Sequence, residues 1–115
     1  MTAPSSFHVT SRTSGTAVVV EVSGEVDLQT ADQVEAAITG GIAGQPSAVV
    51  LDLSAVTFLD SAGLAVLARA HTAAGERVAF RVVAPHRAVR RRIQLAGMDG
   101  MLVTFQTVAE ALAHA

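Results

Sequence analysis

The chain has 115 residues, half of them hydrophobic, and a formal net charge of −2 at pH 7. This length predicts one domain over residues 1–115, with its core within about residues 7–113. The absence of cysteine excludes disulfides, zinc thiolates and cysteine nucleophiles, and is typical of a reducing cytoplasm. No secretory signal opens the chain and no apolar run is long enough to span a membrane, so we expect a cytoplasmic protein.

The first half of the chain alternates between strand and helix patterns. Two β-type runs, Phe7–Arg12 and Ala17–Ser23, are separated by a Ser-Gly turn signal and predict a hairpin. Apolar residues at helical spacing predict a helix over residues 30–43. The continuous apolar run Ala48–Leu53 predicts a strand that is buried on both faces.

The second half continues this alternation. Its expected elements are a helix over residues 61–73, a strand Val78–Val83, a helix from Pro85 to about Leu95, a strand Met101–Phe105 and a helix Thr107–Ala113. Strands separated by helices indicate parallel pairing with right-handed connections. We therefore predict an α/β fold with a mixed five-stranded sheet, antiparallel only in its initial hairpin, and about four helices.

The loops that follow the parallel strands are the expected place for a site, because sites in open α/β sheets lie beyond the carboxyl ends of the strands. Topology alone predicts that Asp27, Ser61 and His86 lie near one rim. Ser61 would stand at a helix start, where unpaired N–H groups and the helix dipole favour a phosphate. Such a serine can be phosphorylated without unfolding the domain, which indicates a switch more than an enzyme.

Each of these residues also has a structural interpretation. Ser61 can be the N-cap of its helix, a contribution of about 1 kcal/mol. Asp27 can begin a turn or cap the next helix, and Asp60 can cap or hold its loop. The four histidines have no ligand spacing, so no metal is predicted. Without a nucleophile–base pair or a phosphate loop, neither catalysis nor a cofactor is expected.

Charge is distributed unevenly along the chain. Residues 1–60 carry seven acidic residues and one arginine, whereas residues 61–115 carry three acidic residues and seven arginines. The arginines of the third expected helix are Arg87, Arg90, Arg91 and Arg92. This basic face is either simply solvated or meets an acidic partner or an anion. No aromatic residue lies among these arginines, which argues against a nucleic-acid surface.

Two segments resemble motifs of a known family, the bacterial anti-sigma factor antagonists with a STAS domain. Gly24-Glu25-Val26-Asp27 resembles the family's G-E-[LIV]-D, and the segment Phe58–Leu64 resembles its D-S-[ST]-G-L element. The order and spacing of the elements also match over residues 7–113. The resemblance implies a single STAS domain that acts by binding, without catalysis of its own.

The resemblance further implies partner switching. The unphosphorylated antagonist binds an anti-sigma factor that is also a serine kinase, and so frees the sigma factor. The kinase phosphorylates the serine, here Ser61, which ends the complex, and a PP2C-type phosphatase restores binding. The implied partner-binding residues are Asp27, Asp60, Ser61, Ala62, Gly63 and Leu64. Ala62 replaces a second hydroxyl residue of the family, which bears on phosphorylation more than on binding.

One alternative of another class stays open. The same fold can serve as a scaffold or ligand-sensing module in a stress-response or transport complex, with Ser61 only capping its helix. Neither interpretation involves nucleic acid or a membrane. Few apolar residues are predicted to be exposed, which favours a monomer.

Overall fold

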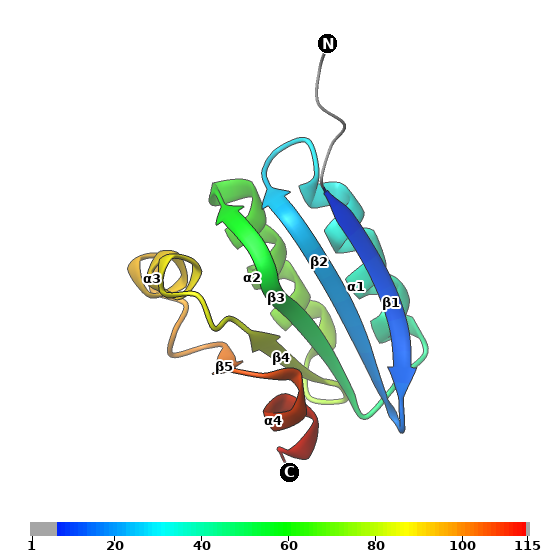
Figure 1. The fold of residues 1–115 in the computed structure, drawn as a ribbon. Coiled ribbons are helices and arrows are strands. Elements are labelled where there is room, and N and C mark those ends of the chain that lie inside the picture. Colours follow the sequence, from blue (N-terminus) through cyan, green and yellow to red (C-terminus); the bar gives the residue numbers. More distant parts are fainter. Residues whose placement is uncertain (1–6, 115) are drawn as a thin grey trace.

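Five strands form one mixed sheet in the order β1-β2-β3-β4-β5 (Figure 1). The strands are β1 (His8–Ser14), β2 (Ala17–Val26), β3 (Ala48–Leu59), β4 (Ala79–Val83) and β5 (Val103–Phe105). Strands β1 and β2 pair antiparallel, and the other neighbours pair parallel. This computed structural model describes residues 7–114 and confirms the predicted α/β fold.

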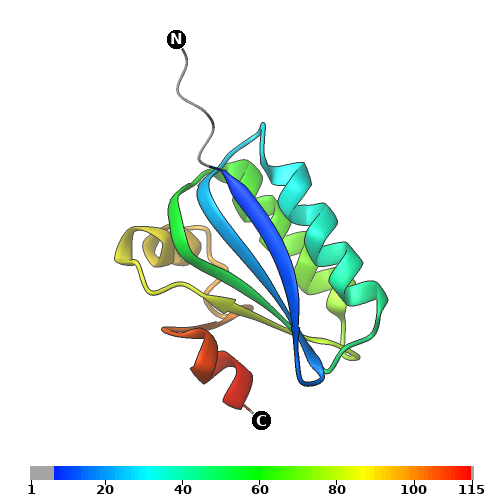
Figure 2. The same cartoon turned by 45° about the vertical axis from the view of Figure 1, so that its right-hand side comes forward.

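Four helices connect or follow the parallel strands: α1 (Ala31–Ala43), α2 (Ser61–Ala74), α3 (Arg87–Leu95) and α4 (Val108–Ala113). Helices α1 and α2 lie side by side on one face of the sheet (Figure 2). Right-handed connections between strands in sequential order require this common face. Helix α4 packs on the opposite face, against β3, β4 and β5.

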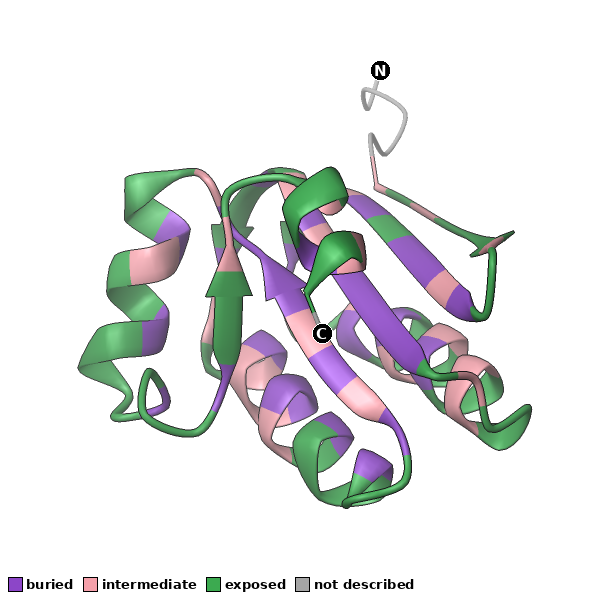
Figure 3. Ribbon diagram, turned by 90° about the horizontal axis from the view of Figure 1, so that it is seen from below, coloured by how far each residue is buried: buried purple, intermediate pink, exposed green. Residues whose placement is uncertain are grey.

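The two faces of the sheet bury separate cores. The larger core lies under α1 and α2 and includes Val20, Leu51 and Leu67. The smaller core joins Val19, Val50 and other strand residues to α4. Figure 3 shows the buried residues concentrated in the central strands and on one side of each long helix. The first half of β3 is covered on both faces, which explains its continuous apolar run.

Strands β2 and β3 are longer than the sequence predicts. Their pairing continues to Val26 beside Leu59, whereas pairing between β3 and β4 ends at Asp52 beside Val83. The prediction that the central strand ends at Leu53 is therefore wrong. Its second half mixes buried and exposed residues and contains register shifts relative to β2, so it lacks the apolar pattern of a fully covered strand.

Candidate functional site

The loops after β2 and β3 are adjacent at the carboxyl edge of the sheet. Val26 and Leu59 are partners in the parallel pairing, and the Asp60 N–H donates to the Val26 carbonyl oxygen at 3.1 Å. Both chains therefore leave the sheet at the same level. The rim predicted for Asp27 and Ser61 is present in the structure.

Asp60 is the N-cap of α2. Its Oδ1 accepts hydrogen bonds from the backbone N–H groups of Ala62 at 2.8 Å and Gly63 at 3.2 Å. The interpretation of Ser61 as the N-cap is therefore wrong. The carboxylate one position earlier takes that role, because its negative charge interacts favourably with the positive end of the helix dipole.

Loss of this cap should destabilise the start of α2. We expect Asp60→Ala to lower the free energy of unfolding by about 1 kcal/mol, while Asp60→Asn keeps most of it. Urea unfolding followed by circular dichroism measures the difference. Equal stability of the alanine variant and the wild type would show that the cap contributes little.

Ser61 is the first residue of α2 and is exposed. Within residues 7–114, its hydroxyl has no hydrogen-bond partner. Two of the first-turn N–H groups expected to be free are occupied by Asp60, so the predicted anion site is only partly available. A phosphoryl group on Ser61 would still lie at the positive end of the α2 dipole.

Asp27 organises the turn that leads into α1. Its Oδ1 accepts hydrogen bonds from the Gln29 N–H at 2.9 Å and the Thr30 N–H at 3.2 Å. The Thr30 hydroxyl in turn donates to the Glu25 carbonyl oxygen at 2.8 Å. The prediction that Asp27 can begin a turn is therefore confirmed. The same hydrogen bonds hold its carboxylate at the rim.

Gly63 allows the start of α2 to pack closely against the last residues of β2 and β3. It is buried, and an added Cβ would collide with Leu59 Cδ1 and approach Val26 Cγ1 to 3.0 Å. Ala62 and Leu64 are partly buried and pack against the larger core. These three residues therefore determine the position of the Ser61 backbone. Gly63 is buried, so only the exposed parts of Ala62 and Leu64 are available to a partner.

His86 lies away from this rim, contrary to the topological prediction. Its Nε2 lies 2.6 Å from the Ser54 carbonyl oxygen. The extended chain from Ser54 to Leu59 covers roughly 15 Å at the rise of a strand. The prediction failed because β4 is shorter than β2 and β3, so its carboxyl end stops further from the rim than their carboxyl ends do.

Exposed apolar residues adjoin the site, and the sequence analysis missed them. Leu28 is 82% exposed directly after Asp27, and Phe58 is 45% exposed near the end of β3. The signal was a large apolar residue inside an otherwise polar loop. Leu95, Met101 and Val103 are exposed elsewhere. The expectation that few apolar residues are exposed is thus wrong, so it no longer supports the prediction of a monomer.

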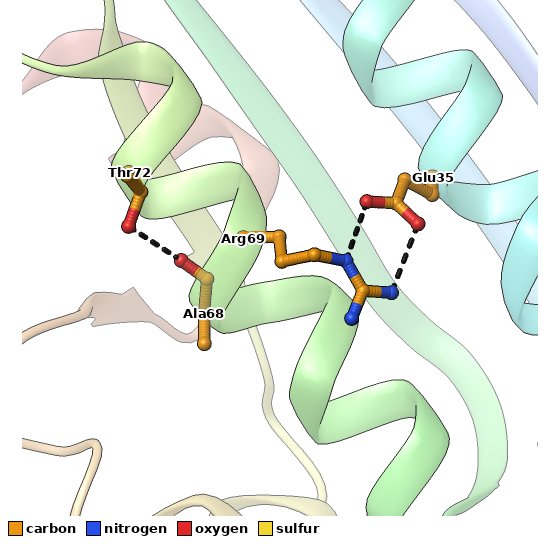
Figure 4. Close-up of polar contacts among 4 residues, drawn as sticks. All are labelled: Glu35, Ala68, Arg69 and Thr72. Carbon is orange, nitrogen blue, oxygen red and sulfur yellow. Dashed lines mark hydrogen bonds and ion pairs between the residues drawn. The ribbon is translucent and has the colours of Figure 1, made fainter.

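An ion pair ties α1 to α2 behind the rim (Figure 4). Arg69 donates from Nε to Glu35 Oε2 at 2.7 Å and from Nη2 to Glu35 Oε1 at 2.9 Å. This side-chain hydrogen bonding lowers the pKa of Glu35 below its ordinary value. The same interaction raises the pKa of Arg69.

The pair predicts a small pH dependence. A carboxyl group whose pKa is lowered by folding stabilises the protein above its unfolded pKa, and this contribution disappears as the pH falls through the folded pKa. Solvent screening keeps the effect small. We expect an NMR titration to give a lower pKa for Glu35 in the wild type than in Arg69→Gln. An identical Glu35 titration in the two proteins would contradict this assignment.

Neither a membrane-spanning helix nor a cluster of metal-ligating side chains is present in residues 7–114. No helix in residues 7–114 has both the length and the apolar character needed to cross a membrane. The same part of the chain contains no group of three or more His, Asp or Glu side chains arranged to hold a metal ion.

The family model of the STAS domain matches residues 8–111. The chain therefore belongs to the STAS domain family. Its relatives within that family include anti-sigma factor antagonists. It is 43% identical to the anti-sigma-F factor antagonist RsfB of Mycobacterium tuberculosis over 112 residues, which are 97% of this chain and 92% of RsfB.

Solved structures agree with this grouping. An anti-sigma factor antagonist from Mycobacterium paratuberculosis is 41% identical, with a TM-score of 0.89 over 97% of this chain and 96% of that one. Unphosphorylated SpoIIAA from Bacillus has a TM-score of 0.73 over 93% of each chain. Its identity is 20%, so this likeness concerns the fold alone. Antagonists of this family regulate by binding and are not enzymes.

Proposed function

We propose that the chain is a phosphorylation-switched antagonist of an anti-sigma factor. In its unphosphorylated form it binds a cognate anti-sigma factor that is also a serine kinase, and this frees the sigma factor. Phosphorylation of Ser61 ends the complex, and a PP2C-type phosphatase restores binding. The nearly full-length similarity to an anti-sigma-F factor antagonist supports an anti-sigma factor as the partner. We place both proteins in the cytoplasm.

The observation that carries the switch is the position of Ser61. The residue is exposed at the first position of α2, and the capping role belongs to Asp60. Its hydroxyl can therefore be modified without removing a structural hydrogen bond. A phosphoserine adds roughly −1.5 to −2 charges at pH 7, and the helix dipole offsets part of their cost. The domain is expected to stay folded in both states.

The proposed contact surface is the rim around Ser61. Asp27 and Asp60 hold carboxylates in adjacent loops, and Gly63 keeps the start of α2 close to the sheet. Exposed parts of Ala62 and Leu64 complete this surface. A phosphate beside two carboxylates repels acidic groups of the partner and obstructs close packing. Release after phosphorylation follows from this local change.

Ala62 bears on the efficiency of the switch. Its methyl side chain lies where the family has a second hydroxyl, and here it packs against the core. We expect phosphorylation to depend on Ser61 alone. A chain that binds the anti-sigma factor but is never phosphorylated would instead be a scaffold or ligand-sensing module of the same fold.

Release of the sigma factor tests the proposed function directly. The purified chain is added to a preformed complex of the anti-sigma factor and its sigma factor, and size-exclusion chromatography measures the free sigma factor. We expect release with the unphosphorylated chain and reassociation of the original complex after ATP is added. A complex that persists in excess antagonist would contradict the proposal.

A further inference from the structure

One edge of β3 has no strand beside it over its second half. Pairing with β4 stops at Asp52, while β3 continues to Leu59. The His86 ring reaches this edge at the Ser54 carbonyl oxygen, at 2.6 Å. Beyond that point, no strand of the described chain covers the edge. Unpaired strand edges bind extended peptides by adding them to the sheet.

A groove lies between this edge and α3. Its volume is about 340 Å³, and small apolar residues, among them Ala55, Val56, Ala88 and Val89, form much of its lining. Figure 1 shows α3 beside the upper part of β3, beyond the end of β4. The groove therefore combines a strand edge with apolar space for the side chains of a bound segment.

Helix α3, which forms one side of this groove, is strongly basic, although its arginines lie beside the groove lining and not within it. It contains Arg87, Arg90, Arg91 and Arg92 and no acidic residue. The ion pairs of the described chain join other residues, so these arginines have no carboxylate partner. Arg92 lies over the Phe58 ring, with 5.8 Å from the guanidinium carbon to the ring centroid. Positive charge thus extends from α3 to the end of β3.

Two features of the charge distribution on α3 are unfavourable in the free chain. Arg87 stands in the first turn, where the helix dipole disfavours a cation. Arg87 and Arg91 are also one turn apart, a spacing at which like charges repel. Carboxylates of a bound partner would relieve both effects. Such violations of local rules are expected where a surface serves a function.

We propose that this groove binds an extended acidic segment of a partner protein, added as a strand to the edge of β3 with a carboxylate on Arg92, the α3 arginine that lies over Phe58 of that strand. The outer strands of a second copy of this chain, β1 and β5, do not fit as the added strand, because they contain no acidic residue. The proposal goes beyond the proposed function, since it concerns a surface away from Ser61.

An NMR titration of the full chain tests this groove. The probe is an eight-residue peptide of alternating glutamate and valine with both ends blocked, and a lysine–valine peptide is the control. We expect saturable amide shifts centred on residues 54–58 and 86–92 with the acidic peptide only. Absence of these shifts at millimolar peptide, or shifts centred on other elements, would overturn the proposal.

Two variants with the same change in net charge distinguish binding at the groove from nonspecific electrostatic attraction of the peptide. Arg92→Glu is expected to weaken binding of the acidic peptide about five-fold or more, because it reverses the charge that lies over Phe58 at the β3 side of α3. Arg77→Glu makes the same change in net charge at an exposed site between α2 and β4, and should leave the affinity within about two-fold. Equal weakening by both variants would also overturn the proposal.

Discussion

A chain with Ser61→Asp is expected to bind its anti-sigma factor roughly ten-fold more weakly than the wild type. The substitution places a permanent negative charge at the exposed start of α2, beside the Asp60 carboxylate. Ser61→Ala is expected to keep the wild-type affinity and to remain bound in the presence of ATP. Isothermal titration calorimetry with the purified anti-sigma factor measures both affinities.

The control for this experiment is Ser11→Asp, which adds the same charge at an exposed position of β1. It should leave the affinity unchanged, because Ser11 pairs with Val20, well before the end of β2 at Val26, where the rim lies. If Ser61→Asp binds as tightly as the wild type, negative charge at this position does not release the partner and the switch is wrongly placed.

Gly63→Ala is expected to destabilise the fold by about 1–3 kcal/mol, since its added methyl group overpacks the start of α2. The nearest atom belongs to Leu59, which is itself only 2% exposed and has little room to move. The displacement should also shift Ser61, so binding of the anti-sigma factor should weaken. Urea unfolding and calorimetry measure the two effects.

Gly40→Ala is the matched control. Gly40 lies in α1, and a Cβ built there has no heavy atom within 4 Å. Alanine at this helical position should stabilise the protein by about 0.5–1 kcal/mol through its higher helix propensity. Similar changes in the free energy of unfolding for the two variants would show that close packing at Gly63 is unimportant.

The architecture was predictable because strong local patterns agree with the final fold. The apolar run of β3, the hairpin at the start and the helical spacing in α1 and α2 all indicate an α/β sheet. The length of β3 beyond Leu53 was not predictable in this way. Its second half is only partly covered, so its burial depends on which elements lie beside it and no single period marks it.

The site was predictable in its location and less so in its detail. Parallel order places Asp27 and Ser61 at one rim, and that depends only on topology. The N-cap depends on backbone angles at one residue, and the sequence offers both Asp60 and Ser61 for it. The distance of His86 from the rim depends on the relative lengths of β3 and β4, which local sequence patterns do not determine.

Intact-mass spectrometry after incubation with ATP and the cognate anti-sigma kinase tests the central claim most directly. The wild type should gain the mass of one phosphoryl group, and Ser61→Ala should gain none. Phosphorylation of the alanine variant would show that the modified residue lies elsewhere. An unmodified wild-type chain that still binds the kinase would contradict the switch at Ser61.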